Sequence, residues 1–266
     1  VFEVRDKDGK MIATFIAEWS GLAMGLWLCR ATLGLPAARD WPRVFDRLRL
    51  KRMAVVNTDI LIRSLLLESI LVSFLLIGGR FGDVTLAANQ VLLQFLMITG
   101  HALDGFAFAA EALVGRAFGA GQVGLLRRGA VLTSAWATAS AALMALCFWL
   151  AGPVIIDLMA TDPGVRAEAR SYLPWMVLAP LTQLGLTMFD GIFIGATRSR
   201  DMRNMMIVST MLYGVALAVF LGPLENHGLW LAMQVSFVAR GLTLALRYPA
   251  LERAAHAAAG PLPRAA

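Results

Sequence analysis

Residues 86–112 read LAANQVLLQFLMITGHALDGFAFAAEA, a run of 27 residues in which apolar side chains dominate. An α-helix rises 1.5 Å per residue and the hydrocarbon core of a bilayer is about 30 Å thick, so about 20 such residues span it. The run therefore predicts a membrane-spanning helix. At roughly 40 Å it is longer than the core, so we expect it to tilt, to bend near Gly100 or Gly105, or to protrude.

Polar side chains interrupt this run at a helical spacing. Gln90, Gln94, His101, Asp104 and Glu111 all fall on one series of alternating four- and three-residue steps, which places them on one face of a helix. Polar groups inside a membrane are costly unless they face protein or water. The stripe therefore predicts a helix that borders a bundle interior or a cavity.

The rest of the chain has the same character. Apolar residues make up 58% of it and charged residues 16%, whereas a typical soluble domain has roughly 45–50% and about 25%. Six further segments approach or reach spanning length: 11–29, 57–78, 129–151, 173–196, 205–221 and 229–246. Lipid offers no hydrogen-bond partner to backbone N–H and C=O groups, so a spanning segment must be a helix or a strand of a closed barrel. These runs are too long for barrel strands. The sequence predicts an all-α, polytopic membrane helix bundle with seven transmembrane helices.

Basic residues are unevenly divided between the two sides of this predicted bundle. Sixteen Lys and Arg residues fall on the side that holds segment 30–56 and the C-terminus, and six fall on the other. An excess of Lys and Arg marks cytoplasmic segments, so we expect 30–56 and the C-terminus to be cytoplasmic. The net charge of +6 then reflects membrane orientation, and we expect no nucleic-acid partner. Residues 39–52 fit either an amphipathic helix on the anionic inner leaflet or an ordinary charged linker.

The beginning of the chain suggests a missing part. Six of the first ten residues are charged, the first residue is Val1, and an odd number of spans places the two ends on opposite sides. We expect a piece of a longer protein whose N-terminal part precedes Val1.

Three carboxylates inside the apolar segments are candidates for binding a proton, a cation or a substrate. Glu68 lies midway along segment 57–78, and Asp104 and Asp190 should lie at similar depths in their helices, each followed by glycine. Such residues usually face the bundle interior and mark function, although they can also be buried hydrogen-bonding struts. The polar groups expected beside them in a cavity are Gln94, His101, Gln183 and Thr187.

Other polar residues suggest structure instead of chemistry. Asp59 and Arg63 are four residues apart, which predicts a structural ion pair along one helix. The three histidines and two cysteines show no metal-ligand spacing, so we expect no metal site and no cofactor.

Three stretches carry a resemblance to a known family. They are 57–65 (NTDILIRSL), 103–120 (LDGFAFAAEALVGRAFGA), and 190–198 (DGIFIGATR) followed by Met202-Arg203-Asn204. They resemble the start of the seventh helix, the eighth helix with its following loop, and the end of the tenth helix in the multidrug and toxic compound extrusion (MATE) transporters, most closely the DinF-like branch. The similarity runs from about residue 11 to 248.

The resemblance implies a twelve-helix fold of two six-helix lobes around a central cavity. Residues 1–29 would be the end of the N-terminal lobe with its sixth helix, 30–56 the cytoplasmic linker, 57–248 the six-helix C-terminal lobe and 249–266 a cytoplasmic tail. The best-known coupling aspartate of such proteins lies on the first helix and so outside this chain. A second site described for other branches would map roughly to Glu68 and Asp190.

The implied function is secondary antiport in a bacterial inner membrane, with organic, often cationic, compounds exported in exchange for H⁺ or Na⁺. The implied partners are a small-molecule substrate, the lipid bilayer and the missing N-terminal lobe, with no cofactor beyond the coupling ion. Three alternatives remain open. They are a flippase for lipid-linked sugars or other amphiphiles, an intramembrane enzyme in which Asp104 and Asp190 form a pair, and a receptor or assembly subunit.

Overall fold

The computed structural model describes residues 3–33 and 45–258, and every regular element in these residues is helical. The elements are α1 (Glu3–Leu33), α3 (Arg47–Gly78), the 3₁₀ helix η2 (Gly79–Phe81), α4 (Asp83–Gly119), α5 (Val123–Met159), α6 (Pro163–Gly195) and α7 (Ser199–Ala258). The predicted all-α class is therefore confirmed for the described part of the chain. Residues 34–44 of the predicted linker 30–56 and residues 259–266 of the predicted tail 249–266 lie outside the described residues.

The contacts divide the chain into two units, Val1–Ala54 and Val55–Ala266. The first unit contains α1, whose side chains from Phe15 to Arg30 are exposed. Within it the rings of Phe15 and Trp19 lie 5.6 Å apart, and the Arg30 guanidinium lies 4.6 Å from the centre of the Trp27 ring. The predicted apolar segment 11–29 lies inside this helix.

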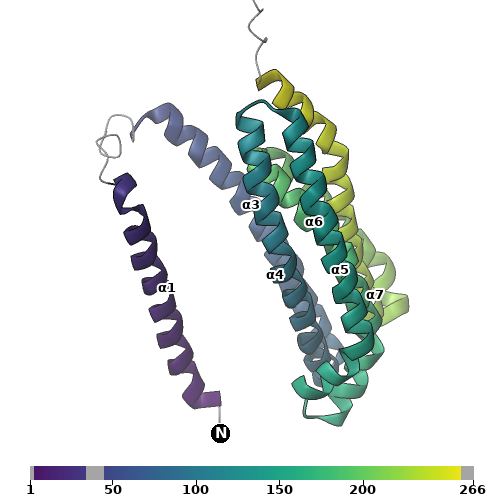
Figure 1. The fold of residues 1–266 in the computed structure, drawn as a ribbon. Helices are drawn as coiled ribbons and strands as arrows, with labels where there is room; N and C mark the ends of the chain where they lie inside the picture. Colours follow the sequence, from purple (N-terminus) through teal and green to yellow (C-terminus); the bar gives the residue numbers. More distant parts are fainter. Residues whose placement is uncertain (1–2, 34–44, 259–266) are drawn as a thin grey trace, which may run out of the picture. The chain divides into compact units, whose positions relative to one another are not determined.

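Five helices are long and apolar enough to cross a membrane: Arg47–Phe81, Asp83–Gly119, Val123–Met159, Pro163–Gly195 and Ser199–Ala257. The last contains two predicted segments, 205–221 and 229–246. At Glu225 the backbone leaves the helical region (φ 49°, ψ −125°), and α7 doubles back there (Figure 1). We call residues 199–224 the first limb of α7 and residues 226–258 its second limb. All seven predicted segments thus lie in helices, while the number of membrane spans remains a prediction.

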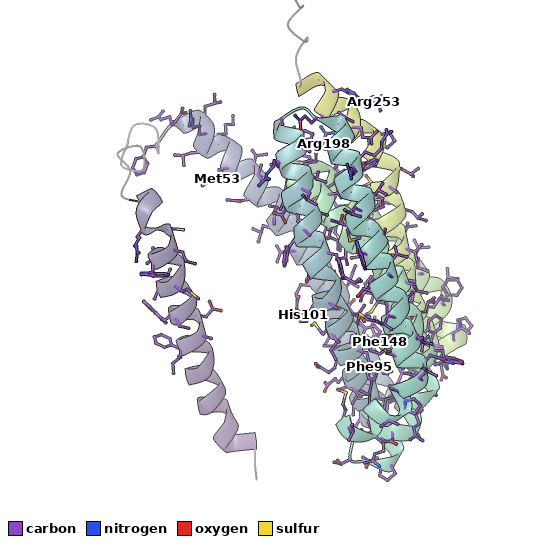
Figure 2. All side chains as sticks on the ribbon, in the orientation of Figure 1. Met53, Phe95, His101, Phe148, Arg198 and Arg253 are labelled. Atoms are coloured by element: carbon purple, nitrogen blue, oxygen red, sulfur yellow. The ribbon has the colours of Figure 1, made fainter. Side chains whose placement is uncertain are left out.

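Successive helices of the second unit run in opposite directions along one bundle (Figure 1). The turns at residues 120–122 and 196–198 therefore lie at one end, which we call the arginine-rich end. Arg198 and Arg253 both lie there, whereas Phe95 and Phe148 lie toward the opposite end (Figure 2). The rings of these two phenylalanines pack edge to face, 5.0 Å apart, and join α4 to α5.

Helices α4 and α6 pack with their backbones in close approach. A Cβ atom added to Gly191 would lie 2.3 Å from the carbonyl oxygen of Ala107, and one added to Gly195 would lie 2.5 Å from that of Glu111. Small residues at helix interfaces are typical of membrane bundles, where packing replaces the hydrophobic effect as the force that joins helices. The two glycines therefore set the distance between α4 and α6.

A buried polar network holds the bend of α7. Asn89 of α4 and Asn226 exchange two hydrogen bonds of 2.8 and 3.0 Å, and the Trp230 indole N–H donates to the Asn89 amide oxygen at 3.0 Å. All three side chains are buried. Farther along, the Ser209 hydroxyl donates to the carbonyl oxygen of Ser236, 2.7 Å away, and so joins the two limbs. The second limb is thus tied both to α4 and to the first limb.

The glycine contact gives a stability prediction. Gly191→Ala should lower the free energy of unfolding by about 1–3 kcal/mol, the usual cost of overpacking, because the new Cβ forces α4 and α6 apart. The measurement is thermal or denaturant unfolding of the purified protein in detergent.

The matched control is Gly214→Ala, since nothing lies within 4 Å of a Cβ at Gly214. That change should leave stability unchanged or raise it, because alanine favours helix more than glycine does. Equal effects of the two substitutions would contradict the packing argument.

Candidate functional site

A cavity of about 580 Å³ opens among α3, α4, α6 and the second limb of α7. Because neighbouring helices are antiparallel, side chains that are far apart in sequence lie at the same height along the bundle and line the same part of the cavity. Toward the opposite end its wall is apolar, and the residues there include Leu71, Leu75, Leu93, Leu96 and Phe237. Toward the arginine-rich end its wall is charged, with Arg63, Asp104, Glu111, Asp190 and Arg240. The cavity is thus amphipathic along its length.

Most of the residues proposed from the sequence meet in this cavity. Glu68, Asp104 and Asp190 all line it, although they come from three different helices. The polar groups His101, Gln183 and Thr187 line it as well.

Gln94 is the exception. It lines a separate pocket of about 360 Å³, together with Gln90 and residues of the connection between α5 and α6. A stripe with seven-residue spacing drifts by about 20° per heptad on a straight helix. Over the three heptads from Gln90 to Glu111, the two ends of the stripe therefore face different neighbours. The structure thus corrects the expectation that Gln94 lies in the main cavity.

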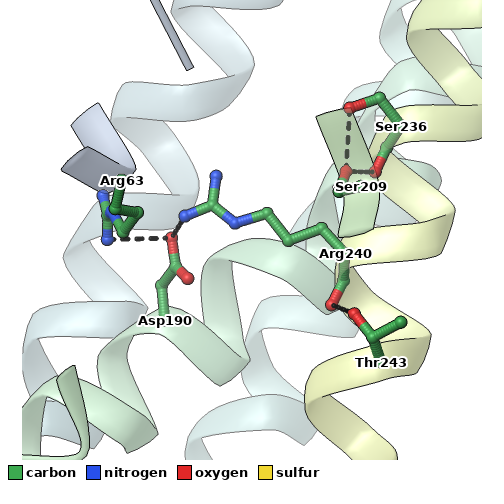
Figure 3. Close-up of polar contacts among 6 residues, drawn as sticks. All are labelled: Arg63, Asp190, Ser209, Ser236, Arg240 and Thr243. Carbon is green, nitrogen blue, oxygen red and sulfur yellow. Dashed lines mark hydrogen bonds and ion pairs between the residues drawn. The ribbon is translucent and has the colours of Figure 1, made fainter. Parts of the chain in front are cut away.

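Asp190 is held by two arginines from different helices. Its Oδ2 accepts a hydrogen bond from Nη2 of Arg240 and one of 3.4 Å from Nη1 of Arg63 (Figure 3). The Arg240 side chain is only 3% exposed, that of Asp190 14% and that of Arg63 16%. Taking such charges out of water costs several kcal/mol each, which only close pairing offsets. The three residues therefore form one buried charge cluster.

The charge around this cluster is acidic overall. Arg63 also interacts electrostatically with Asp104. The cavity wall carries two arginines against four carboxylates, Glu68, Asp104, Glu111 and Asp190. With the histidine neutral, ionised carboxylates would leave the cavity with an excess of negative charge.

The structure corrects the predicted pair of Asp59 and Arg63. Asp59 is buried, accepts a hydrogen bond of 2.5 Å from Arg203 and accepts another of 3.0 Å from Ser199. Arg63 instead reaches across to Asp190. The four-residue spacing permits a pair along α3, but the two side chains point to different helices, so the contacts between helices decide their partners.

Some polar atoms at the cavity have no hydrogen-bond partner among the described residues. They are Asp190 Oδ1, Gln183 Oε1 and Arg63 Nε, all of which are buried. Buried polar atoms are rarely left without a partner unless water, an ion or a ligand supplies one. Two acceptors and one donor in the cavity wall thus lack a hydrogen-bond partner among the described residues.

Sequence reasoning missed Arg240 and the cavity position of Arg63, and it placed Glu111 on the polar face of its helix without proposing it as a site residue. A signal for the arginines was present, because both lie inside apolar segments, where a charge is costly and usually functional. Among the described residues, no group of three His, Cys, Asp or Glu side chains is placed to hold a metal ion.

Comparison with known proteins places the chain in a family. The model of the MatE family matches residues 60–220, which is more than half of the chain. The chain belongs to the MatE family. The match begins in α3, ends in the first limb of α7, and includes Glu68, Asp104 and Asp190.

Individual relatives agree with this assignment. The chain is 38% identical over 245 residues to DNA damage-inducible protein F of Escherichia coli (strain K12), a match that covers 89% of this chain and 52% of that protein. It is 29% identical over 184 residues to the probable multidrug resistance protein NorM of Pseudomonas aeruginosa, covering 64% of this chain and 37% of the relative. The chain spans about half the length, or less, of the curated relatives it matches.

A solved structure shares the fold. The Vibrio cholerae MATE transporter VcmN, in its bent form, superimposes with a TM-score of 0.66 at 20% sequence identity. The match covers 77% of this chain and 47% of VcmN.

The charge cluster gives a second stability prediction. Arg240→Met should lower the free energy of unfolding by up to about 3 kcal/mol, because it leaves Asp190 buried with only the longer contact to Arg63. Thermal unfolding in detergent measures the effect.

The double variant Arg240→Met/Asp190→Asn should regain part of the lost stability, since it removes both charges of the closest pair but leaves Arg63 without its charged partner. If the single variant is as stable as the unchanged protein, or the double variant is less stable than the single one, the pairing does not stabilise the fold.

Proposed function

We propose that this chain is part of a secondary active transporter that exports organic, often cationic, compounds in exchange for H⁺ or Na⁺. The observation that carries the proposal is the meeting of Glu68, Asp104 and Asp190 at one cavity of drug-sized volume in a member of the MatE family. Exchange needs a group that binds either the coupling ion or the substrate, so that each weakens the binding of the other. Carboxylates at a shared cavity meet that need.

The electrostatics favour a cationic substrate. Four carboxylates and two arginines line the cavity, so an organic cation or a coupling ion would compensate the excess negative charge. We assign Glu68, Asp104 and Asp190 as candidates for proton, cation or substrate binding, with His101, Gln183 and Thr187 as polar groups beside them. The names of the relatives lend support, since one is a probable multidrug resistance protein and the solved structure is a transporter.

The second candidate is a flippase for lipid-linked or other amphiphilic compounds. It is favoured by one observation, that Arg63 and Arg240, the cations inside the apolar segments, both line the cavity. The excess of carboxylates speaks for the antiporter. A paired-aspartate enzyme is less consistent with the contacts, because Asp190 accepts hydrogen bonds from two arginines instead of sharing a proton with Asp104.

The proposed context is a multi-pass protein of a bacterial inner membrane. Residues 57–248 would form the six-helix C-terminal lobe, residues 1–29 would contribute the last helix of an N-terminal lobe, and 30–56 and the C-terminus would be cytoplasmic. The missing N-terminal lobe would complete the cavity. Besides the coupling ion, no cofactor is proposed.

The experiment is dye efflux under imposed H⁺ or Na⁺ gradients. The protein is expressed with any sequence that its gene encodes before Val1, and efflux of a cationic dye is followed in membrane vesicles. Asp104→Asn and Asp190→Asn should each abolish gradient-driven efflux, measured per amount of folded protein in the vesicles, because an amide cannot exchange a proton or a cation.

The control is Asp83→Asn, which removes an exposed carboxylate from the first turn of α4. It should leave efflux unchanged. Unaltered efflux by both cavity variants would sink the proposed role of these carboxylates, and the absence of efflux from the unchanged protein under either gradient would sink the proposed function.

A further inference from the structure

Arg63 has more hydrogen-bonding capacity than the described residues use. A guanidinium has five N–H donors. The structure gives Arg63 one hydrogen bond, the contact of 3.4 Å to Asp190, and its Nε is buried without a partner among the described residues. A buried cation in this situation needs an acceptor, and its side chain borders the cavity.

Asp190 does not depend on Arg63 for its charge balance. Arg240 donates to the same oxygen over a shorter distance and is the more deeply buried of the two arginines. The two guanidiniums approach the carboxylate from opposite sides (Figure 3). Asp104 attracts Arg63 electrostatically, but within the described ranges no ion pair joins them. Arg63 is therefore the arginine of the cluster that Asp190 holds less tightly, and the better placed of the two to bind a ligand.

A row of leucines extends from Arg63 along α3, with Glu68 beside it. Leu67, Leu71 and Leu75 follow Arg63 at four-residue steps along α3, and all of them line the cavity. Residues four apart lie one above another on a helix. A compound lying along this row would meet a guanidinium at one end and leucine side chains over the next three turns.

We propose that Arg63 binds the oxyanion (a carboxylate, sulfonate or phosphate) of an amphipathic compound whose apolar body lies against the leucine row. Guanidinium matches such groups because its planar fork donates two parallel hydrogen bonds to them. The inference rests on the proposed transport function and deepens it, since it assigns the acidic group of an acid or zwitterion a binding partner in the cavity. In a zwitterion, the cationic group would face the carboxylates Asp104 and Glu111.

The test compares two dyes that differ in one group. Rhodamine B carries a free carboxylate, and its ethyl ester does not. Their binding to the protein in lipid nanodiscs is measured by fluorescence anisotropy. The unchanged protein should bind the acid more tightly than the ester.

Arg63→Gln should weaken binding of the acid by about tenfold or more, because it removes a charge-assisted hydrogen bond, and it should not weaken binding of the ester. Arg63→Lys should cause a smaller loss, since it keeps the charge without the fork. Arg80→Gln, a change at an exposed position, is the matched control and should alter neither dye. Melting temperatures show whether each variant is folded.

Equal binding of acid and ester by the unchanged protein, or equal weakening of both by Arg63→Gln, would overturn the inference. Competition separates two sources of the oxyanion. Displacement of the acid by phosphatidylglycerol but not by diacylglycerol, which lacks the phosphate, supports a lipid headgroup at Arg63, and no displacement by either supports a free compound. Selective binding of the acid without gradient-driven efflux would contradict the proposed transport and support the oxyanion site. Gradient-driven efflux without selective binding would support transport and overturn the oxyanion site.

Discussion

The close approach of the α4 and α6 backbones is the constraint on which the rest of the site depends. Gly191 and Gly195 leave no room for a Cβ against Ala107 and Glu111. Contact at two successive turns fixes how far α6 is shifted along α4 and how it is rotated against it. The contact therefore also fixes the positions of the neighbouring carboxylates. Asp104 lies three residues before Ala107 and Asp190 immediately precedes Gly191, so both face the same cavity at a similar level. The glycines therefore determine the geometry of the carboxylates as well as the packing.

The bend of α7 supplies the other half of the charge cluster. Arg240 follows Asp190 by 50 residues, and it reaches the carboxylate because the chain reverses at Glu225 and the second limb returns beside the first. The bend is costly, since Glu225 has a positive φ, and the buried hydrogen bonds of Asn89, Asn226 and Trp230 help to hold it. A bend near one end of the bundle thus positions an arginine at the charged part of the cavity.

A buried cluster of two arginines and one aspartate is a poor way to stabilise a helix bundle, because desolvation offsets most of the attraction. Its position suggests a function. The cluster lies at the boundary between the charged and the apolar parts of the cavity, and it leaves one oxygen of Asp190 and the Nε of Arg63 without partners. A coupling ion and a substrate that compete for such atoms would be linked thermodynamically, which is the requirement of exchange.

The sequence by itself determined the helices, since runs of apolar residues long enough to cross a bilayer can satisfy their backbones in no other way here. It also indicated that Glu68, Asp104 and Asp190 face the bundle interior, because helical periodicity and depth are local properties, and all three line one cavity. Only the tertiary structure decided the partners. Asp59 pairs with Arg203 and not with Arg63, Arg240 joins Asp190, and Gln94 faces another pocket. Spacing along one helix gives the face of a side chain, but the rotation and height of the neighbouring helix decide what that face meets.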